Sequence, residues 1–317
     1  MIRFLIRLTA LAIVACLPIP LHAQKPADTT EKIAKTFKVG PSGTLDINNM
    51  SGKVVVSEGG TDTIVIDALK RVRGNVADAK DQLARTTVEM AERAGRVEVR
   101  TVYAGRNLKV SVDYLVMAPA GTTVAVRTLS GDITITGIKG EVRADALSGD
   151  VMLTGTPAVS LAKTMSGDVT VTGVSTQGEL RVSSLSGDVV VRSARARSVD
   201  ADSTSGGVTL IDVTSDRVTG KALSGDVSFA GPLAKGGRYQ FQSQAGDIRL
   251  TLMGAAGFEL DASTFSGSVR SDFPLTVPPG QPVGGQGQRK SVRGVFGDGG
   301  AQIMLRAFSG DITIGKK

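Results

Sequence analysis

A short unit centred on the tripeptide Ser-Gly-Asp recurs from residue 130 almost to the end of the chain. Its glycines, including those of three variant copies, are Gly131, Gly149, Gly167, Gly187, Gly206, Gly225, Gly246, Gly267 and Gly310. Successive glycines are 18, 18, 20, 19, 19, 21, 21 and 43 residues apart, so the last interval is about two periods. A near-constant period of this length indicates stacked copies of one supersecondary unit.

Each repeat contains two segments in which apolar and polar residues alternate. Pairs such as Ile133 and Ile135 follow the glycine by two and four positions, and pairs such as Val124 and Val126 precede it by seven and five. This alternation is typical of a strand with one buried face. Each repeat therefore predicts two strands, and a one-residue shift at Val159 predicts a β-bulge.

Two short strands cannot bury their inward side chains alone, but stacked copies can form a continuous core. The chain is therefore predicted to be all-β, a parallel β-solenoid of two-strand rungs of about 20 residues, with glycine at each sharp corner. An antiparallel meander or sandwich is the competing architecture. Large apolar residues two positions before the glycine are expected to plug the core: Leu129, Leu147, Met165, Leu185, Leu223, Phe265 and Phe308.

Composition divides the chain into four regions. Residues 1–23 are interpreted as a signal peptide, 24–35 as a flexible lead, 36–127 as an N-terminal β-rich capping region, and 128–317 as the repeat solenoid. Within the capping region, the pattern predicts one short helix between residues 75 and 85 and a hairpin turn at 93–95. A Pro/Gly-rich loop is expected at 274–293, followed by a last rung whose terminal lysines discourage end-to-end stacking.

The N-terminus has the features of an export signal. Arg3 and Arg7 precede a short apolar run, and the small residue Ala23 is suited to cleavage. An alternative interpretation is a lipobox ending at Cys16, which would then be acylated. No later stretch has the roughly 18 to 20 apolar residues that a spanning helix needs. The expected location is therefore the periplasm, the outer membrane or the cell surface.

Cleavage after Ala23 would remove Cys16 and His22, the only cysteine and the only histidine. The cleaved chain would lack the side chains for Ser-His-Asp or Cys-His catalysis, for thiolate or imidazole zinc sites and for disulfides. It would keep 35 basic against 30 acidic residues, without a basic run and with few aromatic residues, which disfavours nucleic-acid binding. We therefore predict no catalytic, cofactor-binding or metal-binding residues and no cofactor.

The repeats and three further segments together resemble a known protein family. The Ser-Gly-Asp-Val/Ile-x-Val/Ile units, the early segment 45–52 and the closing segments 294–300 and 308–312 resemble the putative adhesin family of exported bacterial β-strand-repeat proteins, a domain of unknown function. The resemblance covers about residues 36 to 315. It implies a repetitive β fold at the cell envelope and an adhesive role by analogy, and it carries no catalytic residues to transfer.

Stacking would align the aspartates of the repeats along one edge. They are Asp132, Asp150, Asp168, Asp188, Asp226 and Asp247. Like charges about 5 Å apart repel by about 0.8 kcal/mol even in bulk water, so turn N–H groups or cations must compensate them. We interpret these aspartates as hydrogen-bonding turn residues, with a calcium site as the alternative.

Other chemistry is possible on the same scaffold. Paired carboxylates such as Asp150 and Asp168 could cleave a glycan, but the only candidate aromatic platforms are Tyr103, Tyr114 and Tyr239, of which Tyr239 is expected to point inward. Outward threonines could bind a glycan or a protein.

The sequence thus favours a non-enzymatic, exported envelope or cell-surface protein that acts as an adhesin or structural binding scaffold. Its expected partner is a protein or glycan of the envelope or extracellular surface, and its oligomeric state is open. The alternatives are a periplasmic accessory of an envelope-stress or signalling system and a polysaccharide-active enzyme.

Overall fold

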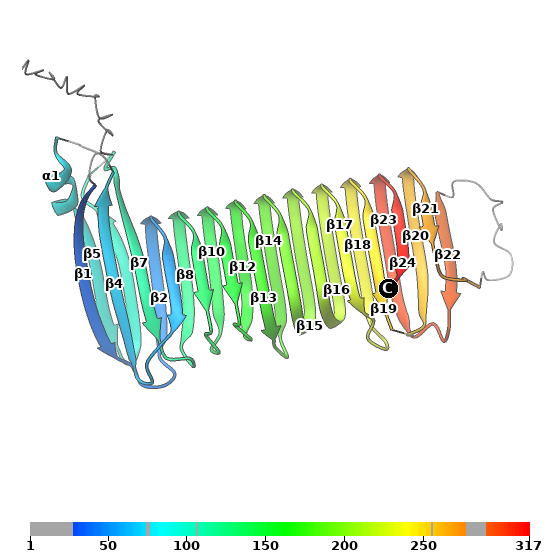
Figure 1. Cartoon of the computed structure of the whole chain (residues 1–317), viewed down its shortest axis with the longest axis horizontal. Helices are drawn as coiled ribbons and strands as arrows, with labels where there is room; N and C mark the ends of the chain where they lie inside the picture. Colours follow the sequence, from blue (N-terminus) through cyan, green and yellow to red (C-terminus); the bar gives the residue numbers. More distant parts are fainter. Residues whose placement is uncertain (1–27, 74–76, 106, 255, 277–289) are drawn as a thin grey trace, which may run out of the picture.

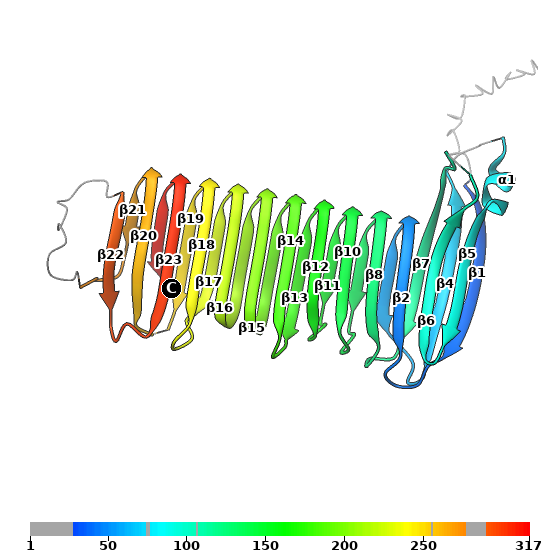
Figure 2. The ribbon, with the colours of Figure 1, turned by 180° about the vertical axis from the view of Figure 1, so that it is seen from behind.

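The chain forms a long, flattened stack of β-rungs (Figures 1 and 2). The computed structural model describes residues 28–73, 77–105, 107–254, 256–276 and 290–317. The expected signal peptide, including Cys16 and His22, lies outside these residues, as does most of the expected loop at 274–293. The described strands belong to one 24-stranded sheet that coils into two opposed layers of strands, called here the first and the second face. Strands β15 and β16 continue around a corner from one face to the other, which joins the two layers.

The strands of the first face are, in stacking order, β5 (Thr86–Arg93), β6 (Arg96–Tyr103), β2 (Thr44–Ser51), β8 (Thr123–Ser130), β10 (Val142–Ser148), β12 (Val159–Ser166), β14 (Glu179–Ser186), the second halves of β15 (Val189–Ser205) and β16 (Val208–Ser224), β18 (Arg238–Ala245), β23 (Ala301–Ser309), β20 (Phe258–Ser266) and β22 (Ser291–Phe296).

The strands of the second face are, in the same direction, β1 (Thr29–Lys38), β4 (Thr63–Val72), β7 (Val110–Ala118), β3 (Val54–Glu58), β9 (Ile133–Thr136), β11 (Val151–Thr154), β13 (Val169–Ser175), the first halves of β15 and β16, β17 (Val227–Pro232), β19 (Ile248–Met253), β24 (Ile312–Lys316) and β21 (Val269–Ser271).

The predicted parallel β-solenoid is confirmed. Neighbouring rungs pair in parallel and without offset, as in Val142 beside Val124 and Val151 beside Ile133. The competing antiparallel meander is therefore wrong for the repeats. The inward valines, isoleucines and leucines of both faces form one buried core along the stack. The bulge predicted at Val159 is present, because the pairing with β10 shifts by one residue just after it.

The corner glycines form a single row. Each has a φ between +116° and +152°, a region open to glycine but not to other residues. A Cβ on Gly187 would meet the carbonyl group of Gly167, the corner glycine of the neighbouring rung, and the same holds along the row. Glycine is thus required both by the backbone angle and by the close approach of the next corner.

The large apolar residues two positions before each glycine do not plug the core, so that prediction is wrong. Leu129, Leu147 and Met165 point outward and are 41–48% exposed. The reason is the two-residue alternation of a strand, which places the residue three positions before the glycine on the inner face and the next one on the outer face. The inner position is held by small residues such as Thr164, Ser184 and Ala222, all buried.

The first rung of the chain lies inside the stack. Strand β2 pairs in parallel with β6 and β8, and β3 pairs in parallel with β7 and β9. Outside β6 and β7, antiparallel strands β5, β4 and β1 complete this end. The expected hairpin turn is formed by Ala94 and Gly95, both with positive φ, and the expected helix is the short α1 (Ala79–Ala84).

The C-terminal rung also lies inside the stack, so it is not the last rung that the repeat pattern predicted. Strand β23 is inserted in parallel between β18 and β20, and β24 between β19 and β21. Antiparallel β22 covers the outer edge of β20. Figure 1 shows the C-terminus one rung in from this end. The terminal lysines therefore cannot protect the end of the solenoid.

Candidate binding surface

The repeat aspartates follow the corner glycines and form one row along the edge of the solenoid. The Oδ1 atom of each accepts a hydrogen bond from the backbone N–H at the same position in the neighbouring rung. The distances are 3.2 Å for Asp150 N to Asp132, 2.9 Å for Asp168 N to Asp150, and 2.8 Å for each of Asp188 N to Asp168, Gly207 N to Asp188, Asp247 N to Asp226 and Asp311 N to Asp247. The aspartates are hydrogen-bonding turn residues, as interpreted from the sequence, but their donors belong to the next rung.

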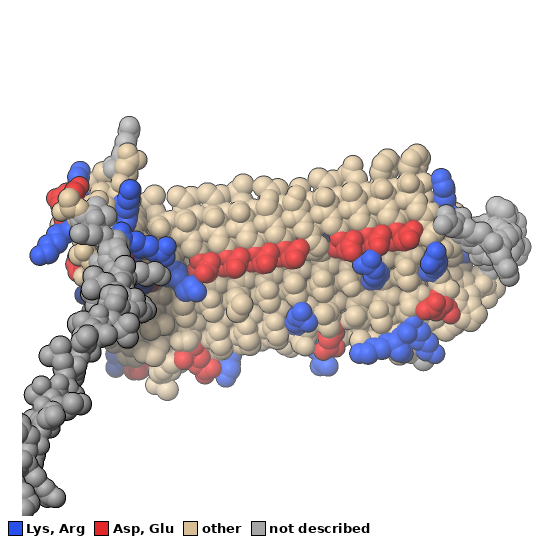
Figure 3. Space-filling view, turned by 45° about the horizontal axis from the view of Figure 1, so that its top comes forward, with Lys and Arg blue, Asp and Glu red and all other residues tan. Residues whose placement is uncertain are grey.

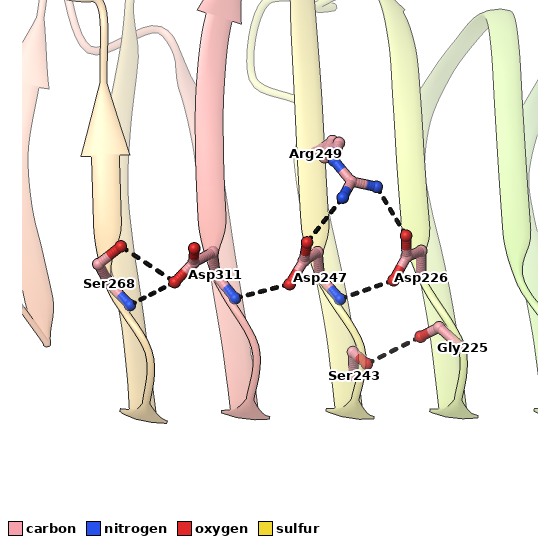
Figure 4. Close-up of polar contacts among 7 residues, drawn as sticks. All are labelled: Gly225, Asp226, Ser243, Asp247, Arg249, Ser268 and Asp311. Atoms are coloured by element: carbon pink, nitrogen blue, oxygen red, sulfur yellow. Dashed lines mark hydrogen bonds and ion pairs between the residues drawn. The ribbon is translucent and has the colours of Figure 1, made fainter.

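Both ends of the row use residues that the sequence analysis missed. At the C-terminal end, Asp311 accepts from the backbone N–H of Ser268 at 2.8 Å and from its hydroxyl at 3.0 Å (Figure 4). These two bonds hold the pKa of Asp311 below its usual range. At the other end, Asp113 accepts from the backbone N–H of Lys53 at 2.9 Å. Asp113 lies outside any Ser-Gly-Asp unit, and only the rung order brings it to this edge.

A second row of hydrogen bonds lies just inside the corner. Hydroxyl groups three positions before the glycine donate to the glycine carbonyl of the neighbouring rung, at 2.9 Å for Thr164 to Gly149, 2.8 Å for Ser184 to Gly167, 2.9 Å for Ser203 to Gly187, 3.0 Å for Ser243 to Gly225 and 2.9 Å for Thr264 to Gly310. Buried carbonyl groups need such partners. The constant offset of these serines and threonines was a visible signal in the sequence.

The outer carboxylate oxygens of the row differ in their partners. Arg249 Nη1 and Nη2 lie 2.6 Å from Oδ2 of Asp226 and 2.6 Å from Oδ2 of Asp247, so one guanidinium bridges two rungs (Figure 4). Partial burial raises the pKa of Asp226, but the Asp247 N–H and the Arg249 guanidinium outweigh it and lower that pKa overall. Lys53 Nζ lies 3.5 Å from Oδ2 of Asp132.

Asp150, Asp168 and Asp188 form no ion pair with any lysine or arginine among the described residues. Figure 3 shows the row as two red segments separated by a gap, with basic side chains near its ends and below its C-terminal segment. Gly207 occupies the aspartate position at the gap. The unpaired carboxylates therefore present a continuous negative charge in the N-terminal half of the row.

The outward apolar residues form a second column beside this row, three positions earlier in each repeat. We call this column the apolar ridge; in stacking order it comprises Met50, Leu129, Leu147, Met165, Leu185, Leu223, Phe308 and Phe265. Thr204 and Gln244 interrupt the column in its second half. At its C-terminal end the rings of Phe265 and Phe308 stack with centroids 5.0 Å apart and planes 5° apart. Phe265 is 67% exposed, the highest value on the ridge.

Two open hollows flank the N-terminal part of the ridge and share Met50 and Leu129 as walls. The larger, of about 1020 Å³, extends to Lys53, Arg71 and Tyr103. The smaller, of about 720 Å³, extends along the ridge to Leu147 and Met165. Met50 and Leu129 therefore protrude between the two hollows and can be contacted from either side.

The side chains considered for metal binding and for glycan cleavage are the carboxylates and the tyrosines. Among the described residues, no group of three or more His, Cys, Asp or Glu side chains is arranged to hold a metal ion. Tyr114 and Tyr239 lie in the core, and burial raises the pKa of Tyr114 to about 12. They cannot serve as platforms for a sugar. Tyr103 is half-buried in the larger hollow, where its hydroxyl donates to the Val110 carbonyl at 3.0 Å.

No helix in the described part of the chain is long and apolar enough to cross a membrane.

The sequence matches one known family over most of its length. The profile of the family described as Toastrack DUF4097 covers residues 44–315. No curated protein gives a sequence match. All of the segments that carried the resemblance noted above lie within the matched range.

The chain is also similar to solved structures. A putative adhesin from Bacteroides fragilis is 12% identical, with 89% of this chain and 96% of that chain covered and a TM-score of 0.39. A putative adhesin from Parabacteroides distasonis is 9% identical, with 90% and 97% covered and a TM-score of 0.41. A putative cell adhesion protein from Clostridium sporogenes is 10% identical, with 91% and 100% covered and a TM-score of 0.25.

Proposed function

The chain belongs to the Toastrack DUF4097 family, and from this premise we propose that it is a non-enzymatic binding scaffold of the cell envelope. In this proposal the protein is exported, and its rigid stack presents the corner edge to a protein or glycan of the envelope or the extracellular surface. Adhesion to such a surface is the specific form of the function that we favour.

The apolar ridge is the observation that carries this proposal. Its eight large apolar side chains are 41–67% exposed and lie in one column. The first five, from Met50 to Leu185, follow one another without interruption, and soluble proteins rarely leave contiguous apolar side chains on the surface unless they bind something there. The parallel rungs behind the ridge are held by a buried core and two rows of hydrogen bonds, so the ridge needs little ordering on binding.

Two measurements test the proposal. The first compares the attachment of cells that carry or lack the protein to host or bacterial surfaces. The second identifies partners cross-linked to the protein in envelope extracts. Replacing Leu147, Met165 and Leu185 with serine should reduce attachment and capture together. The control is Met152→Ser, because Met152 is 49% exposed on the other face. Attachment and capture that survive the triple substitution unchanged would refute the ridge as the binding surface.

Export makes a separate prediction. Protein purified from the envelope fraction should begin at Gln24, and intact-mass measurement should show the loss of residues 1–23. A chain that keeps its first 23 residues and stays in the cytoplasmic fraction would contradict an envelope role.

A further inference from the structure

The apolar ridge runs beside the unpaired carboxylates over several rungs. Leu147, Met165 and Leu185 are exposed, and three positions after each stands Asp150, Asp168 or Asp188. We propose that this strip binds a basic amphipathic helix of a partner protein, with apolar side chains on the ridge and arginine or lysine side chains on the aspartate row. The proposal rests on the proposed binding function and specifies the chemistry of its partner.

Charge complementarity selects a cationic partner. Arg249 already shows how the row receives a guanidinium, because it contacts Oδ2 of Asp226 and of Asp247 at 2.6 Å each. The Oδ1 atoms of Asp150 and Asp168 are occupied by backbone N–H donors, which fixes both carboxylates and leaves their outer oxygens free for a ligand. An arginine from a partner could bridge these rungs in the same way.

The same charge disfavours two other occupants. Two copies of this chain packed ridge to ridge with antiparallel stacks would bring two aspartate rows close together, and like charges oppose that contact. An anionic membrane surface would be repelled by the row for the same reason. A partner that combines apolar and cationic side chains avoids both penalties.

The spacing of the rungs favours a helix over an extended segment. Neighbouring strands lie about 4.8 Å apart, whereas a helix advances about 5.4 Å per turn. Across the four steps from Met50 to Leu185, a helix lying along the ridge would drift by only about 2.4 Å. An extended chain places same-side residues about 6.7 Å apart and would lose register within two rungs.

A designed peptide tests the proposal with the full chain. The probe is a labelled 18-residue helix with leucine along one face and arginine along one flank of that face, and its binding is measured by fluorescence anisotropy. Control peptides have the same composition in scrambled order or glutamate in place of arginine. The designed helix should bind more tightly than either control, and its affinity should fall as salt is raised.

Two sets of variants separate the contributions. Asp150→Asn, Asp168→Asn and Asp188→Asn together keep an oxygen acceptor for the inter-rung bonds but remove the charges, and should weaken binding by about tenfold. Leu147→Ser, Met165→Ser and Leu185→Ser together should weaken it by at least about tenfold. Met152→Ser and Glu259→Gln are the matched controls, and thermal unfolding followed by circular dichroism verifies that each variant is folded.

The proposal is overturned if both triple variants bind the probe as the wild type does, or if the glutamate peptide binds equally well. It is also overturned if sedimentation shows a dimer that the serine variants abolish, because the occupant would then be a second copy. If cell attachment depends on the ridge but the probe does not bind, the proposed function stands and the helical partner is wrong.

Discussion

At the scale of single residues, the edge of the solenoid is built from three positions of each repeat. In five repeats a serine or threonine three positions before the glycine donates to a glycine carbonyl of the neighbouring rung. The glycine turns the chain, and the aspartate that follows it in most repeats accepts a backbone N–H. Each of these bonds links one rung to the next. The repeat is therefore conserved within the chain at the positions that join neighbouring copies.

Three buried positions of this row, Ala146, Ala222 and Ala307, lack a hydroxyl. Ala222 stands three positions before Gly225, between rungs in which Ser203 and Ser243 make the bond. Ala222→Ser should supply a donor for the Gly206 carbonyl and raise the free energy of unfolding by about 0.5–1 kcal/mol, as measured by urea denaturation. Ala201→Ser is the control, because Ala201 faces the apolar core and its hydroxyl should destabilise the protein. Equal effects of the two substitutions would contradict this account.

The corner glycines make a second residue-scale prediction. Gly187→Ala introduces a Cβ against the Gly167 carbonyl and also strains φ, so it should cost about 2–3 kcal/mol. Gly236→Ala is the matched control: its φ is +76°, but nothing lies within 4 Å of the added Cβ, so it should cost about 1 kcal/mol. Comparable losses of stability at the two positions would show that close approach contributes nothing.

The residue-scale chemistry was only partly predictable from the sequence. The glycine and aspartate rows follow from the period, because copies of equal length must align when stacked. The outward ridge was misassigned because large apolar residues were expected to be buried, although strand alternation already placed Leu129 on the outer face. Asp113 was missed because its place in the row depends on the order of the rungs, which local pattern does not encode.

At the scale of elements, strand β20 at the C-terminal end is held by a cluster of ion pairs. Asp261 accepts two bonds of 2.9 Å from Arg306 on β23 and one of 3.1 Å from Arg293 on β22. The side-chain hydrogen bond from Arg306, joined by that from Arg293, lowers the pKa of Asp261. This carboxylate therefore ties the end rung to the strands on both sides of it.

The lowered pKa predicts an acid-sensitive contribution. Because the folded pKa of Asp261 lies below its unfolded value of about 3.9, the contribution is complete above that value and is lost as the pH falls through the folded pKa. Asp261→Asn should therefore lower the free energy of unfolding by about 1 kcal/mol at pH 7 and by progressively less below about pH 4.

Urea denaturation of the wild type and the variant across this pH range measures the effect. Glu259→Gln, on the same strand, is the control and should show no such dependence. A deficit in Asp261→Asn that stays constant down to pH 2.5 would contradict the assignment.

At the scale of the whole molecule, the chain does not add its rungs in sequence order at either end. The rung of β20 and β21 pairs with the rung of β23 and β24, which itself pairs with β18 and β19. Residues 258–271 therefore have no parallel partner until residues 301–316 are in place. The repeat period predicted the stacking, but it could not show which neighbour a rung would choose.

Two deletions test this order. Removal of residues 301–317 should leave β20 and β21 without a parallel partner and expose the edge of β18 and β19. Removal of residues 256–298 would place Gly310 21 positions after Gly246, the same interval as from Gly225 to Gly246, so the rungs should stay in register.

The amides of Gly246 and Ile248 donate to Ser309 and Asp311, so hydrogen exchange should show their protection kept in the internal deletion and lost in the terminal one. If instead the terminal deletion keeps that protection, the inserted rung does not hold the stack together.

The burial of both terminal rungs also limits how such a protein can change its length. A copy of the unit appended at either terminus would meet antiparallel strands instead of a parallel rung, because β1, β4 and β5 close one end and β22 covers β20 at the other. Duplication of an interior unit, such as the rung that begins at Gly167, would instead lengthen the molecule by one step and leave both closures untouched. Differences in solenoid length among related proteins should therefore arise from duplication or loss of repeats in the middle of the gene.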